Sequence, residues 1–335
     1  MTRKTILALG SQGVLGKFTA RALSAAGYDV LRGGRRAESA ADFRLVDLDN
    51  PKTLVAALEG VDLVVSSIED PEARAEREIL RRGGLLLSQA TIPTTARRLR
   101  EADIARGVKG TVVLNSGLTG VCGLVANDLL EQHPDADTIE MGFIISASAS
   151  AGLRGFKTAH AWLTAMPRLP KVRRSFTPPR GSWSCFDLSR NDIIWLSEAS
   201  MANRNVLVHV GIAEKWLDAC LTLLNGVGLL KAMPESLFTL GVRIRPAPDE
   251  LTREPIRMRM AVYRQGKLLA ARGIDAEGDY HSTAQSTRLF SVSLLDLLGR
   301  GGVQSGLRCV EDLFSLRDLH SALADNRICI QPLAI

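Results

Sequence analysis

The 335-residue sequence has no long hydrophobic run and few cysteines, and these absences exclude several classes of protein. No apolar stretch approaches the roughly 20 residues that a membrane-spanning helix needs. The apolar stretch after the basic start covers only Ile6 to Leu9, which is too short for a signal peptide. The five cysteines are widely spaced and include no C-x-x-C pair, so we expect neither a disulfide framework nor a metal site. These features predict a cytoplasmic protein with no membrane partner.

The sequence also lacks internal repeats, low-complexity tracts and the motifs of nucleic-acid-binding proteins. Its net charge of +6 is mild, and the arginines are dispersed apart from two bunches at residues 97–100 and 168–180. We therefore expect no nucleic-acid partner. With 46% hydrophobic and 23% charged residues, the chain has the composition of a globular protein long enough for two modest domains.

The first third of the chain alternates short apolar runs with longer helical patterns. The apolar runs predict strands at residues 5–9, 29–32, 43–47, 61–66, 85–88 and 111–115. Helices are predicted between them at residues 14–26, 51–58 and 71–82, with glycines after their ends and Pro51 at the start of the second. Strands that are apolar along nearly their whole length are typical of a parallel sheet covered on both faces. We therefore predict an α/β fold, a doubly wound parallel sheet of the Rossmann type, over residues 1–130.

The pattern changes after residue 130 and predicts a second, α+β domain over residues 131–300. Strands are expected at residues 138–146 and 206–212, and an antiparallel hairpin at 255–263 and 267–274 turns around Gly266. Helices are expected at residues 155–166, 214–224 and 286–298. The stretch from 167 to 185 is rich in proline, arginine and aromatic residues, which predicts a long loop.

The segment from Leu7 to Gly16 carries three glycines with the spacing G-x-x-G-x-x-G between a buried strand and a helix. Gly10 permits a tight turn, Gly13 lets the backbone approach a pyrophosphate, and Gly16 lets the helix pack closely on the strand. The free N–H groups at the start of the helix then face the phosphates. This strand–turn–helix pattern predicts a dinucleotide-binding site rather than a turn without a ligand. The cofactor-binding residues expected in this turn are Gly10, Ser11, Gln12, Gly13, Val14, Leu15 and Gly16.

The second strand indicates which nicotinamide cofactor this site would bind. NAD-binding sites place an acidic residue near the end of this strand, where it binds the ribose 2′-hydroxyl. Here the segment from Leu31 to Arg36 has no carboxylate and places Arg35 and Arg36 after Gly34. Because arginine binds a 2′-phosphate by bidentate hydrogen bonds, we predict NADP(H) as the cofactor. Further cofactor contacts are expected after the next parallel strands, at Asp47, Leu48, Ser66, Ser67, Ile68 and Ala90.

These motifs together resemble the saccharopine dehydrogenase-like (saccharopine reductase) NADP-binding family. The likeness covers the glycine turn, the Gly34-Arg35-Arg36 segment and residues 46–67, and a similar glycine-containing turn follows at residues 115–120. Residues 302–313 are similar to that family's closing segment. The resemblance implies an NADP-dependent oxidoreductase with a second domain for the substrate and for dimerisation, often a homodimer, whose residues 301–335 pack back on the first domain. Where many members carry a Gly-Pro pair, this chain has the sequence Ile68-Glu69-Asp70-Pro71.

Reduction of a C=N or C=O bond also needs a proton from a side chain or from water. The Tyr-x-x-x-Lys pattern from Tyr263 to Lys267 straddles the predicted hairpin turn, which argues against a standard short-chain dehydrogenase. His160 follows a segment of small residues and is our first candidate for the proton donor, with a solvated helix histidine as the alternative. Tyr280 and His281 are the next candidates.

These observations favour an NADPH-dependent reductase that acts on an imine, ketone or activated alkene of a small metabolite. Two alternatives stay open. One is a non-catalytic NADP(H)-binding sensor or regulator, since no diagnostic catalytic spacing is present. The other is an atypical short-chain dehydrogenase, which a separate sheet formed from residues 138–274 would exclude.

Overall fold

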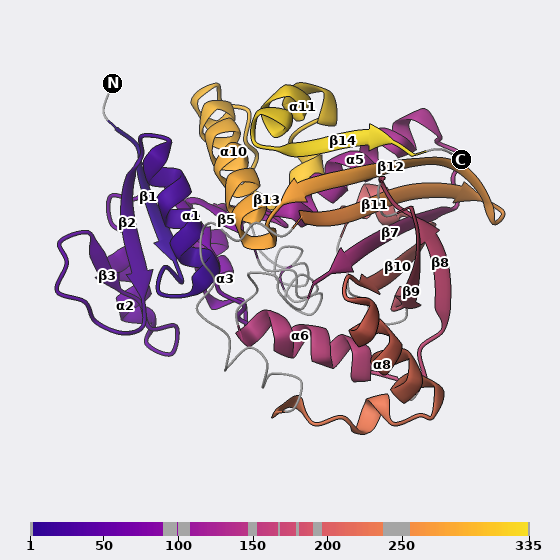
Figure 1. Cartoon of the computed structure of the whole chain (residues 1–335). Helices are drawn as coiled ribbons and strands as arrows, with labels where there is room; N and C mark the ends of the chain where they lie inside the picture. Colours follow the sequence, from indigo (N-terminus) through magenta and orange to yellow (C-terminus); the bar gives the residue numbers. More distant parts are fainter. Residues whose placement is uncertain are drawn as a thin grey trace. The chain divides into compact units, whose positions relative to one another are not determined.

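The computed structural model of the chain describes residues 3–89, 99, 108–146, 153–166, 168–178, 181–189, 196–236 and 255–333. The chain forms two compact units. Unit 1 comprises Met1–Gly123 and Thr283–Phe314, and unit 2 comprises Leu124–Ser282 and Ser315–Ile335. Each unit is built around one β-sheet (Figure 1).

The described part of unit 1 contains a seven-stranded sheet in which all the strand pairs are parallel. The helices α1 (Val14–Ala25), α2 (Pro51–Ala57) and α3 (Arg74–Arg82) connect successive strands. The strands are β1 (Thr5–Leu9), β2 (Asp29–Gly34), β3 (Phe43–Leu45), β4 (Leu63–Ser66), β5 (Leu85–Ser88), β6 (Thr111–Leu114) and β13 (Gly306–Cys309). This arrangement confirms the predicted doubly wound parallel sheet.

The chain order of these strands reverses at β1. The spatial order is β13-β6-β5-β4-β1-β2-β3, so the chain builds outward from β1 first on one side and then on the other. Ligands of open parallel sheets bind beyond the carboxyl ends of the strands at such a reversal. The loops that follow β1, β2 and β4 therefore meet at the edge where a ligand is expected. The apolar runs that predicted these strands form the core, and Leu7, Leu9 and Leu63 are fully buried.

Two helices contribute residues to both units: α5 (Leu118–Gln132) and α10 (Asp279–Gly299). The division of the chain at residues 123, 282 and 314 therefore differs from the predicted domain limits at 130 and 300. The C-terminal stretch is divided as well, because β13 pairs with β6 in unit 1 whereas β14 (Ile328–Pro332) pairs with β12 (Lys267–Glu277) in unit 2. The sequence analysis predicts neither β13 nor β14, whose partners β6 and β12 lie far from them in the chain.

Unit 2 contains a mixed sheet whose order in the described residues is β14-β12-β11-β7-β10-β9-β8. Only β7 and β10 run parallel among its described pairs. Its further strands are β7 (Thr138–Ile145), β8 (Lys171–Ser175), β9 (Ser182–Asp187), β10 (Asn205–Ile212) and β11 (Pro255–Arg264). Its further helices are α6 (Leu153–Thr164), α7 (Glu198–Met201), α8 (Lys215–Gly226) and α11 (Leu316–Asp325). Because these strands form a sheet of their own, the second domain is α+β as predicted, and an atypical short-chain dehydrogenase is excluded.

The expectation of a loop over residues 167–185 was wrong, because β8 and β9 form an antiparallel pair there. Val172 and Trp183 pack against a buried cluster formed by Ile144, Phe176 and Cys185. The arginines obscured this pattern in the sequence. Their charges suggested a solvated loop, whereas the structure pairs Arg174 with a buried carboxylate that lies 34 residues earlier in the chain.

The central strand β7 has one apolar face and one polar face, because successive side chains of a strand point to opposite sides. On the apolar face, Phe143 meets Trp162 of α6 edge to face with the ring centroids 6.1 Å apart. On the other face, Glu140 is completely buried. Gly142 follows on that same face, where a Cβ atom would lie 3.2 Å from Cζ of Phe176.

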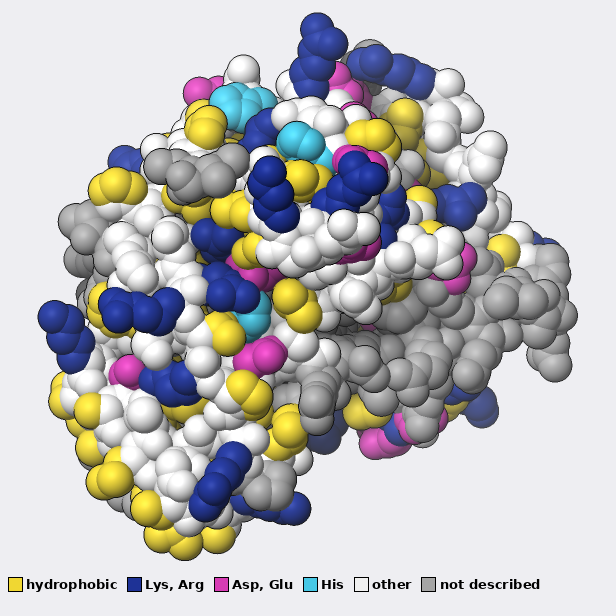
Figure 2. Space-filling model, turned by 90° about the vertical axis from the view of Figure 1, so that its right-hand side faces the viewer, with side chains coloured by type: hydrophobic (Ala, Val, Ile, Leu, Met, Phe, Trp, Pro, Cys, Tyr) yellow, Lys and Arg dark blue, Asp and Glu magenta, His cyan; other side chains and the backbone are white. Residues whose placement is uncertain are grey.

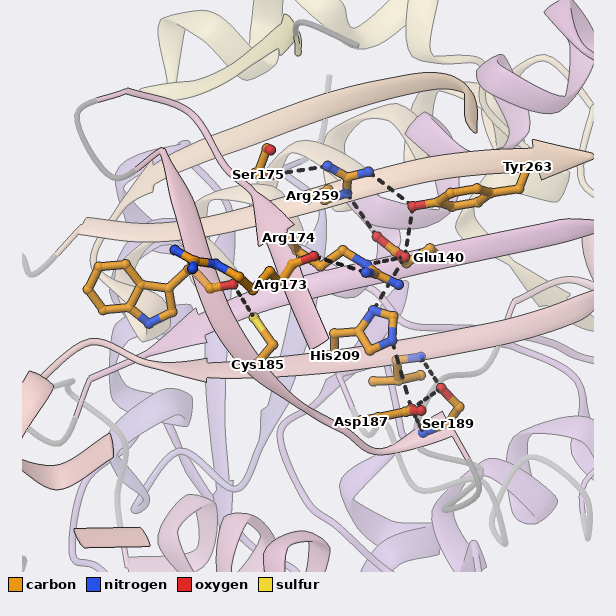
Figure 3. Close-up of polar contacts among 12 residues, drawn as sticks. Glu140, Arg173, Arg174, Ser175, Cys185, Asp187, Ser189, His209, Arg259 and Tyr263 are labelled. Atoms are coloured by element: carbon orange, nitrogen blue, oxygen red, sulfur yellow. Dashed lines mark hydrogen bonds and ion pairs between the residues drawn. The ribbon is translucent and has the colours of Figure 1, made fainter. Parts of the chain in front are cut away.

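Glu140 is the centre of a polar network that joins four strands of this sheet (Figure 3). Its Oε1 accepts a hydrogen bond from Nε of Arg259 at 2.8 Å. Its Oε2 accepts from Nε of Arg174 at 2.5 Å and from the hydroxyl of Tyr263 at 2.9 Å. Nδ1 of His209 lies 3.4 Å from Oε2, outside hydrogen-bond geometry, so that contact is electrostatic. The other ring nitrogen of His209 lies 3.8 Å from Oδ1 of Asp187.

The partners of Glu140 decide its charge. Burial alone would raise the pKa of this carboxyl, but His209 and the guanidinium groups of Arg259 and Arg174 outweigh burial and lower the pKa from 4.5 to about 2. Glu140 is therefore ionised at neutral pH. The network compensates one buried negative charge with several donors, as a charge in a low-dielectric interior requires.

On the face shown in Figure 2, lysine and arginine side chains are interspersed with hydrophobic and uncharged ones. Within the described residues, no helix combines the length and the apolar character needed to cross a membrane.

Replacing Glu140 with glutamine should destabilise the protein by about 3–5 kcal/mol, because the buried Arg259 and the half-buried Arg174 would lose their counter-charge. Urea unfolding at pH 7 measures this change. Asp135→Asn is the control, since Asp135 forms an ion pair with Arg264 in which both side chains are about half exposed. That control should cost less than about 1 kcal/mol. Equal losses for the two variants would show that the Glu140 charge does not stabilise unit 2.

The stabilisation by Glu140 should disappear in acid. Since its pKa is lowered on folding, its contribution is complete above pH 4.5 and is lost as the pH falls towards 2, by roughly 3 kcal/mol in all. The buried Glu76 acts with the opposite sign, because its pKa is raised to about 6, but this residue is the same in both proteins and cancels. The gap in unfolding free energy between wild type and Glu140→Gln should therefore shrink between pH 7 and pH 3. A gap that does not change with pH would contradict the assignment.

Candidate functional site

The glycine turn between β1 and α1 is tied to the end of β2. The N–H groups of Gly10 and Ser11 donate to the carbonyl oxygen of Gly33 at 3.0 and 3.2 Å. The Ser11 hydroxyl donates to the same oxygen at 3.1 Å. Gly10 has a φ of +79°, in the left-handed region that glycine adopts without strain. The turn therefore lies directly beside the carboxyl end of β2.

The three glycines of the turn have different surroundings. A Cβ atom at Gly16 would lie 2.1 Å from the carbonyl oxygen of Gly10, so this position packs α1 against the turn. A Cβ atom at Gly10 would lie 3.0 Å from Cγ1 of Ile68, which follows β4. Gly13 is exposed, and its nearest contact from a Cβ atom would be Gly10 O at 3.3 Å. Gly13 is thus the position where the turn is most open.

Helix α1 begins directly after Gly13, which is its extended N-cap residue. The first turn of a helix leaves N–H groups without carbonyl partners, here those of Val14, Leu15 and Gly16. No side chain caps them, and the first turn contains no acidic residue. These donors and the helix dipole favour an anion at this end of the helix.

The loop after β2 carries the two arginines that the sequence singled out. Arg35 and Arg36 are exposed, and among the described residues neither guanidinium group has an ion-pair partner. Arg32, within the strand, has its charge compensated by Asp42 at 2.8 Å and by Glu38 at 2.9 Å. The unpaired cationic groups of this loop are therefore the two that directly follow Gly34.

The sequence predicts Gln12 as a cofactor contact but not that its side chain connects the glycine turn to the loop after β2. Glu38, its partner in that loop, was not singled out at all. Nε2 of Gln12 donates to the carbonyl oxygen of Arg36 at 2.7 Å and to Oε1 of Glu38 at 2.9 Å. Its Oε1 accepts from the N–H of Arg36 at 3.2 Å. Glu38 lies 26 residues beyond Gln12, and no spacing in the sequence predicts that contact.

The other expected cofactor residues lie at the carboxyl ends of neighbouring strands. Asp47 and Leu48 follow β3 and are half-buried, and the backbone of Asp47 both donates to and accepts from the hydroxyl of Thr53. Ser66 ends β4, and the N–H of Ser67 donates to the carbonyl oxygen of Leu9 at 3.0 Å. Ala90 lies outside the described residues.

Gln89, directly after β5, connects several of these loops. Its N–H donates to the carbonyl oxygen of Ser66 at 2.9 Å, and its Oε1 accepts from the hydroxyl of Ser67. Its Nε2 donates to the hydroxyl oxygens of Thr19 and Thr287 at 3.0 and 2.7 Å. This buried amide therefore joins the loops after β4 and β5 to α1 and α10, and it holds the strand ends together.

Glu76 of α3 lies behind the same edge. Its Oε1 accepts a hydrogen bond from the Ser88 hydroxyl at 3.0 Å, and burial raises its pKa from 4.5 to about 6. A perturbed carboxyl often marks a functional site, but Glu76 is only 2% exposed. Its role here is to hold the end of β5.

The expected proton donors lie in unit 2. His160 is on α6, half-buried, and its Nε2 lies 2.7 Å from the carbonyl oxygen of Met233. Since a carbonyl only accepts, this contact places a proton on Nε2. Tyr280 and His281 are half-buried in the first turn of α10. Tyr263 and Lys267 flank the turn between β11 and β12, as predicted, and the Tyr263 hydroxyl donates to Glu140.

No group of three or more histidine, cysteine, aspartate or glutamate side chains suited to a metal ion occurs in the part of the chain that the structure describes.

Compared by sequence, the chain matches no protein-family profile and no curated protein. Compared by structure, it is similar to the apo form of saccharopine dehydrogenase (L-Glu forming) from Saccharomyces cerevisiae, with a TM-score of 0.59 and 12% identity over 99% of this chain and 100% of that one. A meso-DAP dehydrogenase variant from Clostridium tetani follows, with a TM-score of 0.48 and 10% identity over 96% of this chain and 100% of that one. The chain has a saccharopine dehydrogenase-like fold.

Proposed function

We propose that this chain is an oxidoreductase that uses NADP(H) to reduce a C=N, C=O or activated C=C bond of a small metabolite. One observation carries the proposal: at the carboxyl edge of a parallel sheet, an open glycine turn lies beside two arginines that form no ion pair with any described residue. The shared fold with a dehydrogenase supports the reaction class. The resemblance of the sequence motifs to the same family supports the cofactor.

The described residues fit the phosphates of such a cofactor. Gly13 has no side chain over the start of α1, so a pyrophosphate could approach the N–H groups of Val14 and Leu15. Arg35 and Arg36 would bind the 2′-phosphate, since their guanidinium groups are exposed and not engaged in ion pairs with described residues. Asp47 and Leu48 would lie on the adenine side. Ser66, Ser67, Ile68 and Ala90 would lie on the ribose and nicotinamide side.

When bound, NADPH would supply the hydride to the carbon of the C=N or C=O bond. The nitrogen or oxygen of that bond must then receive a proton. We assign this step to one of the half-buried groups of unit 2, His160 on α6 or Tyr280 and His281 on α10.

Replacing both Arg35 and Arg36 with alanine should weaken NADPH binding by about 3 kcal/mol, roughly a hundredfold in Kd, and barely affect NADH. Only NADPH has the 2′-phosphate that these groups would bind. Titration of the purified protein, followed by nicotinamide fluorescence, measures both constants.

The control for that experiment is Arg81→Ala with Arg82→Ala, which removes two exposed guanidinium groups from α3. It changes the net charge equally and should leave the preference for NADPH unchanged. Equal weakening of both cofactors by the Arg35 and Arg36 substitutions would refute the 2′-phosphate assignment, and binding of neither cofactor by wild type would refute the proposed function.

Alanine substitutions at Gly13 and Gly16 should have different effects. Gly13→Ala places a methyl group where the pyrophosphate would approach, and it should weaken NADPH and NADH at least tenfold with a small change in stability. Gly16→Ala forces a Cβ atom to within 2.1 Å of Gly10 O, so it should destabilise the fold by about 1–3 kcal/mol. Binding titrations and urea unfolding distinguish them. Full affinity in Gly13→Ala would place the pyrophosphate elsewhere.

A further inference from the structure

The side-chain amide of Gln12 is fully used in holding the loop that follows β2. Both hydrogens of Nε2 have acceptors, the carbonyl oxygen of Arg36 and the carboxylate of Glu38. Oε1 accepts from the N–H of Arg36. Gln12 therefore binds Arg36 at both backbone groups, as a second strand would. With its donors occupied, this amide is placed to orient the loop rather than to bind a phosphate itself.

Gly34, at the end of β2, leaves room for the side-chain amide of Gln12. A Cβ atom at Gly34 would lie 2.6 Å from Oε1 of Gln12 and 2.7 Å from its Cδ. The amide of Gln12 thus lies against the bare backbone of residue 34, which positions it beside Arg36. The side chain of Gln12 thus joins the glycine turn to the end of β2.

The loop that follows β2 also carries a negative charge, on Glu38. A free carboxylate here would repel a 2′-phosphate and would accept hydrogen bonds from a ribose 2′-hydroxyl, as the acidic residue of NAD-binding sites does. In this chain its Oε1 accepts from Gln12 and its Oε2 from Nη1 of Arg32 at 2.9 Å. Arg32 is itself held by Asp42 at 2.8 and 3.1 Å. Glu38 is thus ion-paired with Arg32, whose single positive charge it shares with Asp42, and it is anchored by the amide of Gln12.

We propose that Gln12 is a positioning residue for cofactor choice, which holds Arg35 and Arg36 towards the 2′-phosphate and keeps Glu38 bound to Arg32 and away from it. This inference rests on the proposed function, because it concerns which nicotinamide cofactor the same site prefers. It assigns to one side chain of the glycine turn a role in specificity, separate from the binding of the pyrophosphate.

The test compares Kd for NADPH and NADH in wild type, Gln12→Ala and Gln12→Glu. Wild type should prefer NADPH. Gln12→Ala should reduce that preference at least tenfold, with less than a threefold change for NADH, because the loop loses its anchor while the turn stays intact. Gln12→Glu should reduce it further, since its carboxylate would face Glu38. Adding Glu38→Gln to Gln12→Glu should restore part of the preference, because the new amide at residue 38 can donate to the carboxylate at residue 12.

Arg44→Met is the control, since it removes two hydrogen bonds that a side chain of the neighbouring strand β3 donates, to the backbone carbonyl oxygens of Ala57 and Glu59. It should leave the cofactor preference unchanged, and thermal unfolding without cofactor confirms that all variants are folded. An unchanged preference in folded Gln12→Ala and Gln12→Glu would overturn the inference. If the Arg35 and Arg36 substitutions still reduced the preference, the proposed function would stand. Wild type that binds neither cofactor, or both equally, would overturn the inference as well.

Discussion

The close approach of Gly16 to the carbonyl oxygen of Gly10 is the constraint on which the candidate site depends. A side chain at residue 16 would push α1 away from the end of β1, because its first carbon would lie 2.1 Å from that oxygen. With glycine there, the helix starts directly beside the turn, and its first N–H groups open at the carboxyl edge of the sheet. The same turn binds the end of β2 through Gly33 O. The missing side chain at Gly16 thus lets the start of α1 lie beside the turn, and the turn is itself bonded to the end of β2.

Two amide side chains, those of Gln89 and Gln12, connect the loops at the carboxyl edge of the parallel sheet. Gln89 joins the loops after β4 and β5 to two helices, and Gln12 joins the turn to the loop after β2. Amides suit this task because each one both donates and accepts, and neither changes its charge with pH. The cations of Arg35 and Arg36 are then left for a ligand, whereas Glu38 is held in an ion pair with Arg32.

In unit 2, by contrast, a charged side chain, that of Glu140, is completely buried. Glu140 lies on the central strand of the sheet and accepts from residues of β8 and β11. Burying a carboxylate is costly unless it is paired and hydrogen-bonded, so the network ties these strands into one register: a shift of either strand would leave an unpaired buried charge. The Tyr-x-x-x-Lys pattern is explained here as well, because Tyr263 is a partner of Glu140 on a hairpin strand.

Much of unit 1 could be predicted from the sequence, because the signals are local. Each apolar run that becomes a buried parallel strand is continuous in the chain, and the spacing of Gly10, Gly13 and Gly16 reports the turn that they form. The strands β8 and β9 were missed because the charge of Arg174 suggests a solvated loop until its partner is known. The division of the chain into two units falls within α5 and α10, and neither helix shows a break in its sequence that would indicate it.

The sequence by itself determined the parallel sheet, the glycine turn and the two arginines that follow β2, since each depends on residues close together in the chain. Only the tertiary structure decided that Gln12 binds Arg36 and Glu38, 24 and 26 residues away, and that Glu140 pairs with Arg259, 119 residues away. The physical reason is that a sequence reports the type of each side chain, whereas a hydrogen bond or ion pair depends on where folding places the partner.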